Sequence, residues 1–332
     1  MFRYRIGVMV LFVVACAPPA EGQREAHVSS ARQDPLQALA YLLDGAWTAS
    51  GEIPGFGKYE TVRTYERTLG ARFIDFHQTS RVGDNTLEVR GIVGLHPETK
   101  KVTAWGFSSD GAIAITQCEC KSAEEFVFEG RLVGSPQAGP VRGTFRRTAE
   151  DRFVETVERQ VEGKWRVTFE LVFRRADASI TEVRATSLDA GVRALAPLEG
   201  RWEASGESGG RHYTTEYDFR WAVGGKFLIS EYRVKQGGPA ELHAVSFIGY
   251  HPDEGLMQYG FSADGPVFTA KIKPDAEGRV VFEGEMLAGS QRRRMRISYR
   301  RLSDNELETS TEMWRSGAYQ SMGTGVMKRV KP

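Results

Sequence analysis

The chain has 332 residues, with 44 lysines and arginines against 43 aspartates and glutamates, so its formal net charge at pH 7 is +1. The charges are interspersed and the densest basic run is Arg292-Arg293-Arg294, which argues against nucleic acid as a partner because phosphate binding needs a larger basic surface. A chain of this length is expected to form about two domains.

The N-terminal segment has the pattern of an export signal. Arg3 and Arg5 precede an apolar stretch over 6–15, which is too short to cross a bilayer of roughly 30 Å as a helix. The stretch ends in Val13-Val14-Ala15-Cys16, which resembles the lipobox of bacterial lipoproteins. The alternative is an ordinary secretory signal that is cleaved nearby, around Gly22-Gln23.

The lipobox resemblance implies that Cys16 accepts a lipid and becomes the first residue of the mature protein. We therefore expect a signal peptide over 1–15 and a polar, flexible tether over 16–33. Ala17 rather than aspartate follows Cys16. By analogy with Gram-negative lipoproteins, this implies an exported protein of the bacterial cell envelope, anchored in the outer membrane and facing the periplasm.

The first ordered element is expected to be a short helix. Asp34 and Pro35 are favoured at the cap and at the first helical position, and apolar residues then recur on one face up to Gly45. A second helix of this kind starts near Ser187 and ends before Pro197.

The rest of the chain is an internal duplication. Leu43-Asp44-Gly45-Ala46-Trp47 returns as Leu198-Glu199-Gly200-Arg201-Trp202, and Trp202 minus Trp47 gives an offset of 155. Gly106-Phe107-Ser108-Ser109-Asp110-Gly111 returns in the same way as Gly260-Phe261-Ser262-Ala263-Asp264-Gly265. This register predicts two domains of one fold, over 34–175 and 187–332, joined by a linker over 176–186.

After each tryptophan, runs rich in β-branched and aromatic residues are separated by turn residues about every 8 to 12 positions, which is typical of antiparallel β meanders. In the first repeat we expect strands at 47–51, 58–69, 72–82, 86–96, 101–107, 112–120, 125–132, 141–148, 152–161 and 164–175. Such consecutive hairpins favour closure into a barrel over a sandwich. The predicted fold is all-β, with two tandem antiparallel up-and-down barrels, each preceded by a short helix.

A Gly-x-Trp string on the first strand, with cationic residues on the last strand, resembles the calycin superfamily of lipocalins and fatty-acid-binding proteins. This resemblance implies that the indole closes one end of the barrel and that a terminal-strand cation packs over it. The strings Gly224-Gly225-Lys226-Phe227 and Gly249-Tyr250-His251-Pro252 also resemble a bacterial lipocalin-like domain of unknown function. The barrel-closing residues would be Trp47, Arg174, Arg175, Trp202, Lys328 and Arg329.

The resemblance implies a barrel interior that holds a small hydrophobic or amphipathic molecule. Side chains that recur between the repeats are the candidates for ligand contact: Tyr59 and Tyr213, Glu158 and Glu312, and Trp165 with its counterpart Tyr319. Arg142 and Arg296 also recur, and in fatty-acid-binding barrels an inward arginine holds a carboxylate. Strand alternation places both arginines opposite the apolar positions, so we expect them to face water.

No metal or cofactor is expected. His96 and His251 recur before prolines, and a turn role is favoured over a metal-ligand or general-base role because no second ligand lies at a suitable spacing. Residues 141–175 and 295–332 contain no histidine, which argues against the heme site of similar nitrobindin-like barrels. Cys118 and Cys120 share a strand face, but a disulfide over so short a span would be strained.

The sequence leaves three functions open. The first is a membrane-anchored lipoprotein that binds a small amphipathic molecule inside a barrel. The second is a structural or interaction protein of the envelope with filled barrels. The third is an enzyme on an amphipathic substrate, with Glu158 and Glu312 as first candidates, although no known catalytic motif is present. The volume and lining of the two interiors would distinguish the first two functions.

Overall fold

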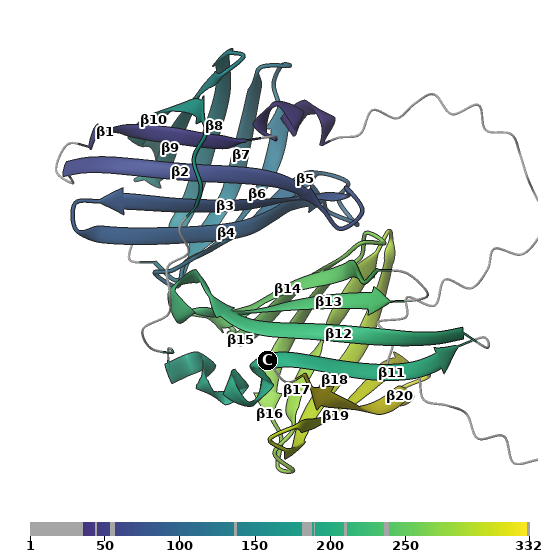
Figure 1. Cartoon of the computed structure of the whole chain (residues 1–332). Helices are drawn as coiled ribbons and strands as arrows, with labels where there is room; N and C mark the ends of the chain where they lie inside the picture. Colours follow the sequence, from purple (N-terminus) through teal and green to yellow (C-terminus); the bar gives the residue numbers. More distant parts are fainter. Residues whose placement is uncertain are drawn as a thin grey trace, which may run out of the picture.

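A computed structural model describes residues 36–43, 45–53, 57–135, 138–180, 188, 190–208, 211–235 and 239–330. In this part of the chain, two closed antiparallel barrels of ten strands each follow one another (Figure 1). The predicted fold class is therefore confirmed. The predicted signal peptide, the tether with Cys16, and the helix caps Asp34-Pro35 and Ser187 lie outside the described residues.

The first barrel places its strands around the ring in sequence order, and the last strand returns to pair with the first. Each connection is a hairpin, so every strand edge is used and none is left open. The strands are β1 Ala46–Ile53, β2 Gly57–Thr68, β3 Phe73–Val82, β4 Asn85–Leu95, β5 Val102–Ser108, β6 Ile113–Cys120, β7 Glu125–Val133, β8 Gly139–Ala149, β9 Arg152–Val161 and β10 Lys164–Ala176.

The second barrel repeats this topology, with β20 returning to β11. The strands are β11 Gly200–Ser208, β12 Arg211–Ala222, β13 Phe227–Lys235, β14 Glu241–His251, β15 Gly255–Ser262, β16 Val267–Pro274, β17 Val280–Ala288, β18 Gln291–Ser303, β19 Glu306–Arg315 and β20 Ala318–Arg329. A one-turn 3₁₀ helix, η3 (Val223–Gly225), connects β12 to β13.

A short helix stands before each barrel, as predicted, and both are 3₁₀ helices: η1 (Gln37–Leu42) and η2 (Ala190–Leu198). Their apolar residues are buried at one end of the following barrel, with Leu39 and Leu42 in the first and Val192 and Leu195 in the second. Burial of these side chains fixes the helices over the barrel ends.

The two barrels pack against each other through the outer faces of β3–β5 and β13–β15. The Phe107 ring stacks on Phe247 with centroids 4.3 Å apart and contacts Phe227 at 5.3 Å. Phe73 contacts Phe261 at 5.8 Å. Since Phe73 corresponds to Phe227 and Phe107 to Phe261 in the duplication, the contacts are reciprocal. The interface therefore has the self-complementary character of a two-fold contact between identical subunits.

The barrels lie in opposite directions across this interface. A Cβ atom added to Gly224, in the connection at the η2 end of the second barrel, would lie 2.9 Å from the Ser109 side chain of the first. Reciprocally, a Cβ atom on Gly70 would lie 3.9 Å from the carbonyl oxygen of Ala263. Ser109 and Ala263 belong to turns at the ends opposite the helices, so the helix end of each barrel lies beside the other end of its neighbour.

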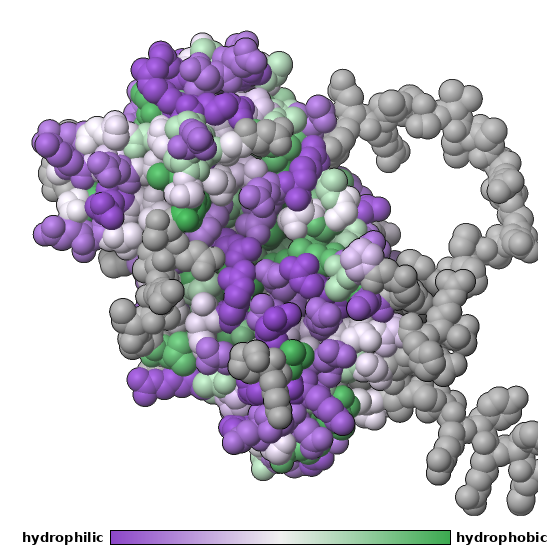
Figure 2. Space-filling model, in the orientation of Figure 1, coloured by the Kyte–Doolittle hydropathy of each residue, from purple (hydrophilic) through white to green (hydrophobic). Residues whose placement is uncertain are grey.

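The face drawn in Figure 2 is mostly hydrophilic over both barrels, with small apolar areas between the charged side chains. Many of these charges are paired across neighbouring strands, for example Arg90 with Asp75 at 2.8 Å and Arg300 with Glu308 at 2.9 Å. Cross-strand pairs of opposite charge stabilise a sheet modestly, so these contacts belong to the scaffold.

Candidate functional site

The first barrel is closed at the η1 end by Trp47, whose side chain is fully buried. Its indole N–H donates to the Leu42 carbonyl oxygen at 2.8 Å, which ties the ring to η1. The Arg175 guanidinium lies 4.6 Å from the centre of the indole and donates to the carbonyl oxygens of Leu43 and Tyr41 at 2.9 and 2.7 Å. A cation over an indole face is an attractive arrangement.

The second barrel repeats this closure. The Trp202 indole N–H donates to the Leu198 carbonyl oxygen at 2.8 Å, and the Arg329 guanidinium lies 4.2 Å from the ring centre. Arg329 also donates to the Glu199 carbonyl oxygen at 2.8 Å. The adjacent candidates are Arg174 and Lys328. In the strand register they lie opposite Thr48 and Glu203 of the first strands, and both side chains are exposed. One cation of each predicted pair thus covers the indole.

A cavity of about 620 Å³ occupies the first barrel, within the range of roughly 300–1,000 Å³ usual for small-molecule sites. It extends from Leu39 and Leu42 of η1 to Val82, Asp110 and Ser135 at the opposite end. Asp110 lines the cavity and is also exposed to solvent. The interior therefore reaches solvent at the end away from the helix, which we call the mouth.

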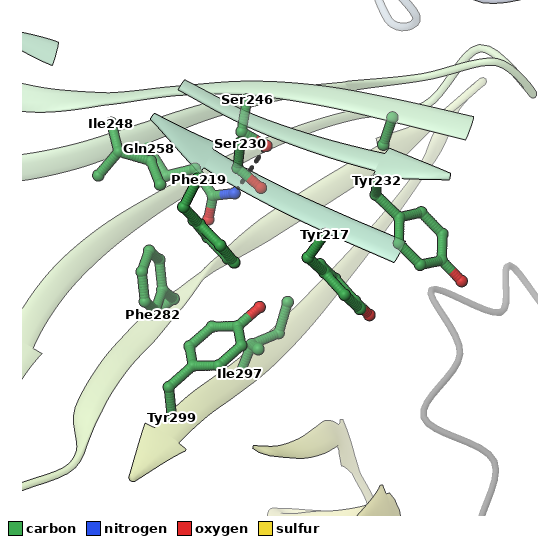
Figure 3. Close-up of a pocket in the computed structure, with 11 residues that line it drawn as sticks. Tyr217, Phe219, Ser230, Tyr232, Ser246, Ile248, Gln258, Phe282, Ile297 and Tyr299 are labelled. Atoms are coloured by element: carbon green, nitrogen blue, oxygen red, sulfur yellow. Dashed lines mark hydrogen bonds between the residues drawn. The ribbon is translucent and has the colours of Figure 1, made fainter. Parts of the chain in front are cut away.

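The second barrel is filled. Its interior retains a space of about 10 Å³, which is near the minimum for a single water molecule. Figure 3 shows the rings of Phe219, Phe282 and Tyr299 pointing toward one another inside the barrel. Tyr299 lies 6.0 Å from Phe219 and 5.5 Å from Phe282 between ring centres. The corresponding positions of the first barrel are also aromatic, Tyr65, Phe128 and Phe145, and line its cavity, so the filling of the second barrel depends on other positions.

The strand pairings show which substitutions make the difference. Three inward positions carry small residues in the first barrel and larger ones at the corresponding positions of the second. These are Ala104 against Gln258, Ala114 against Phe268, and Gly143 against Ile297. The larger residues are all buried, whereas all three small residues line the cavity. Smaller side chains at these three positions therefore contribute to the hollow interior of the first barrel.

A polar cluster is built into the wall of the cavity around Arg63. Its guanidinium donates to the Glu155 carboxylate at 2.8 Å, to the Gln78 side-chain oxygen at 2.6 Å and to the Tyr65 hydroxyl at 3.0 Å. The Gln78 amide donates in turn to the Ser80 hydroxyl at 2.8 Å. The cluster joins the neighbouring strands β2 and β3 to β9, which lies far from them in the sequence.

The charges in this cluster compensate each other. Arg63 is 6% exposed and Glu155 is 8% exposed. Burial lowers the pKa of the Arg63 guanidinium, but the Glu155 carboxylate and Tyr65 raise it, and the net pKa lies above its usual value. In the filled barrel the two positions hold Tyr217 and Thr309. A buried ion pair is therefore a property of the hollow barrel.

The predicted ligand residues divide between the two sides of the wall. Tyr59 lines the cavity, and its counterpart Tyr213 is buried in the filled barrel. Glu158 and Trp165 lie on the outer face: Glu158 pairs with Arg142 at 3.5 Å, and the Arg142 guanidinium lies 4.1 Å from the Trp165 ring centre. Their outward position prevents contact with a molecule inside the barrel.

The second barrel carries the same outer cluster. Glu312 pairs with Arg296 at 3.5 Å, Arg296 lies 4.0 Å from the Tyr319 ring centre, and the Tyr319 hydroxyl donates to Glu283 at 2.9 Å. Arg142 and Arg296 face outward, as alternation predicts. The cluster is a cross-strand ladder of the scaffold, so Glu312 and Tyr319 are not interior residues either.

Sequence reasoning missed three of the charged residues that line the cavity, namely Arg63, Glu155 and Arg159. The signal lies in β9, where Phe153, Glu155, Val157 and Arg159 alternate on one face. A charge at every second inward position is unusual for a packed core.

The two histidines that recur between the repeats, His96 and His251, stabilise the turns that follow them. His96 Nδ1 accepts hydrogen bonds from the backbone N–H groups of Glu98 and Thr99, both at 3.3 Å, and His251 Nδ1 accepts one from Asp253 at 3.2 Å. Within the described residues, no three potential metal ligands gather at one place. The same residues include no helix with the length and apolar character needed to span a membrane.

The two described cysteines are free thiols. Cys118 is half-buried, and burial raises its pKa to about 12, whereas Cys120 is exposed.

Comparison with protein-family models and with curated proteins finds no match. Among solved structures, the chain is similar to Rv2717c from M. tuberculosis, with 17% identity over 43% of this chain and 97% of that one, and a TM-score of 0.32. It is also similar to a protein of unknown function from the DUF3598 family of Nostoc punctiforme PCC 73102, with 10% identity, 89% and 99% coverage, and a TM-score of 0.23. Similarity at this level assigns neither a family nor an activity, and the chain stands as a tandem barrel protein of unknown function.

Proposed function

We propose that this protein binds one small hydrophobic or amphipathic molecule inside its first barrel, while the second barrel serves as a solid support. The observation that carries the proposal is the contrast between an interior of about 620 Å³ and one of about 10 Å³ on the same scaffold. A packed core leaves few voids larger than a water molecule, so we expect an interior of this size to hold a bound molecule.

The lining indicates what kind of molecule fits. Most of the wall is apolar, with Phe76, Val93 and Leu171 among its residues, and polar groups gather around Arg63. A site of this kind gains affinity from apolar burial and orientation from a few polar contacts. The closed helix end supports the resemblance to lipocalins and fatty-acid-binding proteins, because an indole and a cation seal the end opposite the mouth.

The test is to fill the first barrel with residues that the second barrel already accommodates. The variant carries Ala114→Phe and Gly143→Ile, which copies Phe268 and Ile297. A Cβ atom on Gly143 would meet no atom closer than 3.5 Å, so the site accepts a side chain. The control is Ala149→Phe, which adds the same ring at an exposed position of β8.

Binding is measured with the uncharged fluorescent probe N-phenyl-1-naphthylamine and by native mass spectrometry of the purified protein. The expected result is one site per chain in the native protein and in the Ala149→Phe control. The filled variant should lose at least about tenfold in affinity, equivalent to about 1.4 kcal/mol. Two sites per chain, no binding by the native protein, or equal binding by the filled variant would refute the proposal.

We also propose that Cys16 carries a lipid that anchors the protein at the outer membrane, facing the periplasm. Support comes from the apolar stretch over 6–15 that ends at this cysteine. A Cys16→Ser variant should move from the membrane fraction to the soluble periplasmic fraction, and the native protein should incorporate labelled palmitate. An unlipidated native protein would leave the ordinary secretory signal as the explanation.

A structural role in the envelope fits the second barrel by itself, because its interior is filled. The first barrel does not need a large cavity for such a role, and this favours ligand binding. An enzymatic role through Glu158 and Glu312 is not supported, because both carboxylates are engaged by arginines on the outer faces.

A further inference from the structure

The mouth of the first barrel carries positive charge on one hairpin. Arg159 lines the cavity, and Arg166 is its direct partner across the β9–β10 pairing. Directly opposite residues of an antiparallel pair lie on the same face of the sheet, so Arg166 is on the inward face too. Lys164 lies two residues before Arg166 and therefore shares this face. The hairpin thus presents three cations on the side of the interior.

These cations lie beyond the buried ion pair, toward solvent. Arg159 is four residues past Glu155 on β9, about 13 Å along the strand, and the Glu162-Gly163 turn follows. The Glu155 carboxylate is already paired with the Arg63 guanidinium at 2.8 Å, so it is not available to the cations at the mouth. The interior therefore has a neutralised pair midway and a cationic rim at the mouth.

The ion pair of Arg166 lies in solvent, at the exposed end of the rim. Arg166 pairs with Glu162 at 3.5 Å, but their side chains are 61% and 83% exposed, and such surface pairs contribute little. Burial lowers the pKa of Arg159, which is the effect of desolvating a cation. Asp110, another mouth residue, has an oxygen that accepts the Ala112 backbone N–H at 3.0 Å and caps its own turn.

The filled barrel lacks this rim. The strand register matches Arg159 with Met313 and Arg166 with Gln320. The position of Lys164 corresponds to Ala318, which pairs with Arg315, the one cation of the equivalent hairpin face. Most of the positive charge at the mouth is therefore present only in the barrel that has a cavity.

We propose that the occupant of the first barrel is an anionic amphiphile, whose carboxylate or phosphate head group binds to Arg159 and Arg166 at the mouth. Its apolar chain extends past the Arg63–Glu155 pair toward η1. Arginine suits such head groups because it offers planar, charge-assisted hydrogen bonds to paired oxygens. This inference rests on the proposed function and adds the chemical class and orientation of the ligand.

The test compares three probes with the same twelve-carbon chain: dodecanoate, dodecyl phosphate and dodecanol. Each displaces N-phenyl-1-naphthylamine from the full-length protein. The variant is Arg159→Gln with Arg166→Gln. The matched control is Arg131→Gln with Arg146→Gln, which removes the same charge from exposed positions of β7 and β8.

At least one anion is expected to bind about tenfold more tightly than dodecanol to the native protein and the control, a difference of about 1.4 kcal/mol. The double rim variant should lose this preference and keep its affinity for dodecanol. Preference for dodecanoate or for dodecyl phosphate distinguishes a carboxylate from a phosphate head group. In the native protein, raising the salt from about 20 mM to about 500 mM should weaken anion binding selectively, because salt screens exposed charges.

The outcomes separate this inference from the proposed function. If dodecanol binds as tightly as both anions, or if the rim variant retains the preference, the anionic head group is refuted and the cavity remains a binding site. If none of the probes binds, both proposals fail. If the rim variant does not fold, the salt dependence of the native protein decides, and affinity that is independent of salt refutes the rim.

Discussion

The Arg63–Glu155 pair allows the sharpest test of the interior, because the duplication supplies an uncharged replacement for each partner. Replacing Glu155 by threonine, the residue at position 309, leaves the Arg63 guanidinium without its counter-charge in a site where Arg63 is 6% exposed. Removing one partner of a buried ion pair typically costs about 3–5 kcal/mol.

The structure places the expected cost at the lower end of that range. Arg63 would keep its hydrogen bonds to Gln78 and Tyr65, at 2.6 and 3.0 Å, and its position 4.7 Å from the Phe173 ring centre. The cavity also admits water, which reduces the desolvation of the charge. We therefore expect Glu155→Thr to destabilise the first barrel by about 3 kcal/mol.

The double variant Arg63→Tyr with Glu155→Thr should be more stable than the single variant by about 2 kcal/mol, because it removes the uncompensated charge. Amide hydrogen exchange measured by mass spectrometry suits a chain of two barrels, since it reports local opening free energies. Peptides of β2 and β9 report on the first barrel, and peptides of β12 and β19 are the internal reference. A loss below about 1 kcal/mol in the single variant, or a double variant no better than the single one, would contradict the reasoning.

Three further results are expected. Arg175→Ala should lower the free energy of unfolding of the first barrel by about 1–3 kcal/mol, because it removes two hydrogen bonds and the cation over Trp47; Arg174→Ala is the control, and an equal loss in both would remove the special role of Arg175. Iodoacetamide at pH 8 should label Cys120 well before Cys118, since the thiolate is the reactive form and the pKa of Cys118 is about 12; peptide mapping that finds equal rates would contradict this. Phe107→Ala should cost about 3–5 kcal/mol and raise hydrogen exchange in both barrels, and an effect confined to the first barrel would show that the interface does not couple them.

The fold could be predicted from the sequence because its signals are local. Turn residues between alternating strands set each hairpin, so the expected strands 152–161 and 164–175 correspond closely to β9 Arg152–Val161 and β10 Lys164–Ala176. The recurrence of Gly-x-Trp set the register of the two repeats. Closure was favoured because consecutive hairpins leave two strand edges, and pairing these edges with each other removes both.

The site could not be predicted in the same way. Glu158, Trp165, Glu312 and Tyr319 were chosen because they recur between the repeats, and recurrence selects what both barrels share, which is the outer ladder of the scaffold. Several features of the cavity, among them the Arg63–Glu155 pair, differ between the repeats and could not be selected in this way. The small residues on β5, β6 and β8 contribute to one cavity only after the barrel has closed. No local sequence pattern indicates how much space they leave together.

The reciprocal packing of the two halves has a consequence for how many molecules the protein can carry. In an assembly of two identical chains, any change to a barrel interior occurs twice, so both copies are hollow or both are solid. Joining the copies in one polypeptide removes that constraint, and each half can change by itself. This chain keeps the symmetric contact that holds the two halves together and combines one hollow barrel with one filled barrel, so the proposed function implies a single bound molecule per polypeptide.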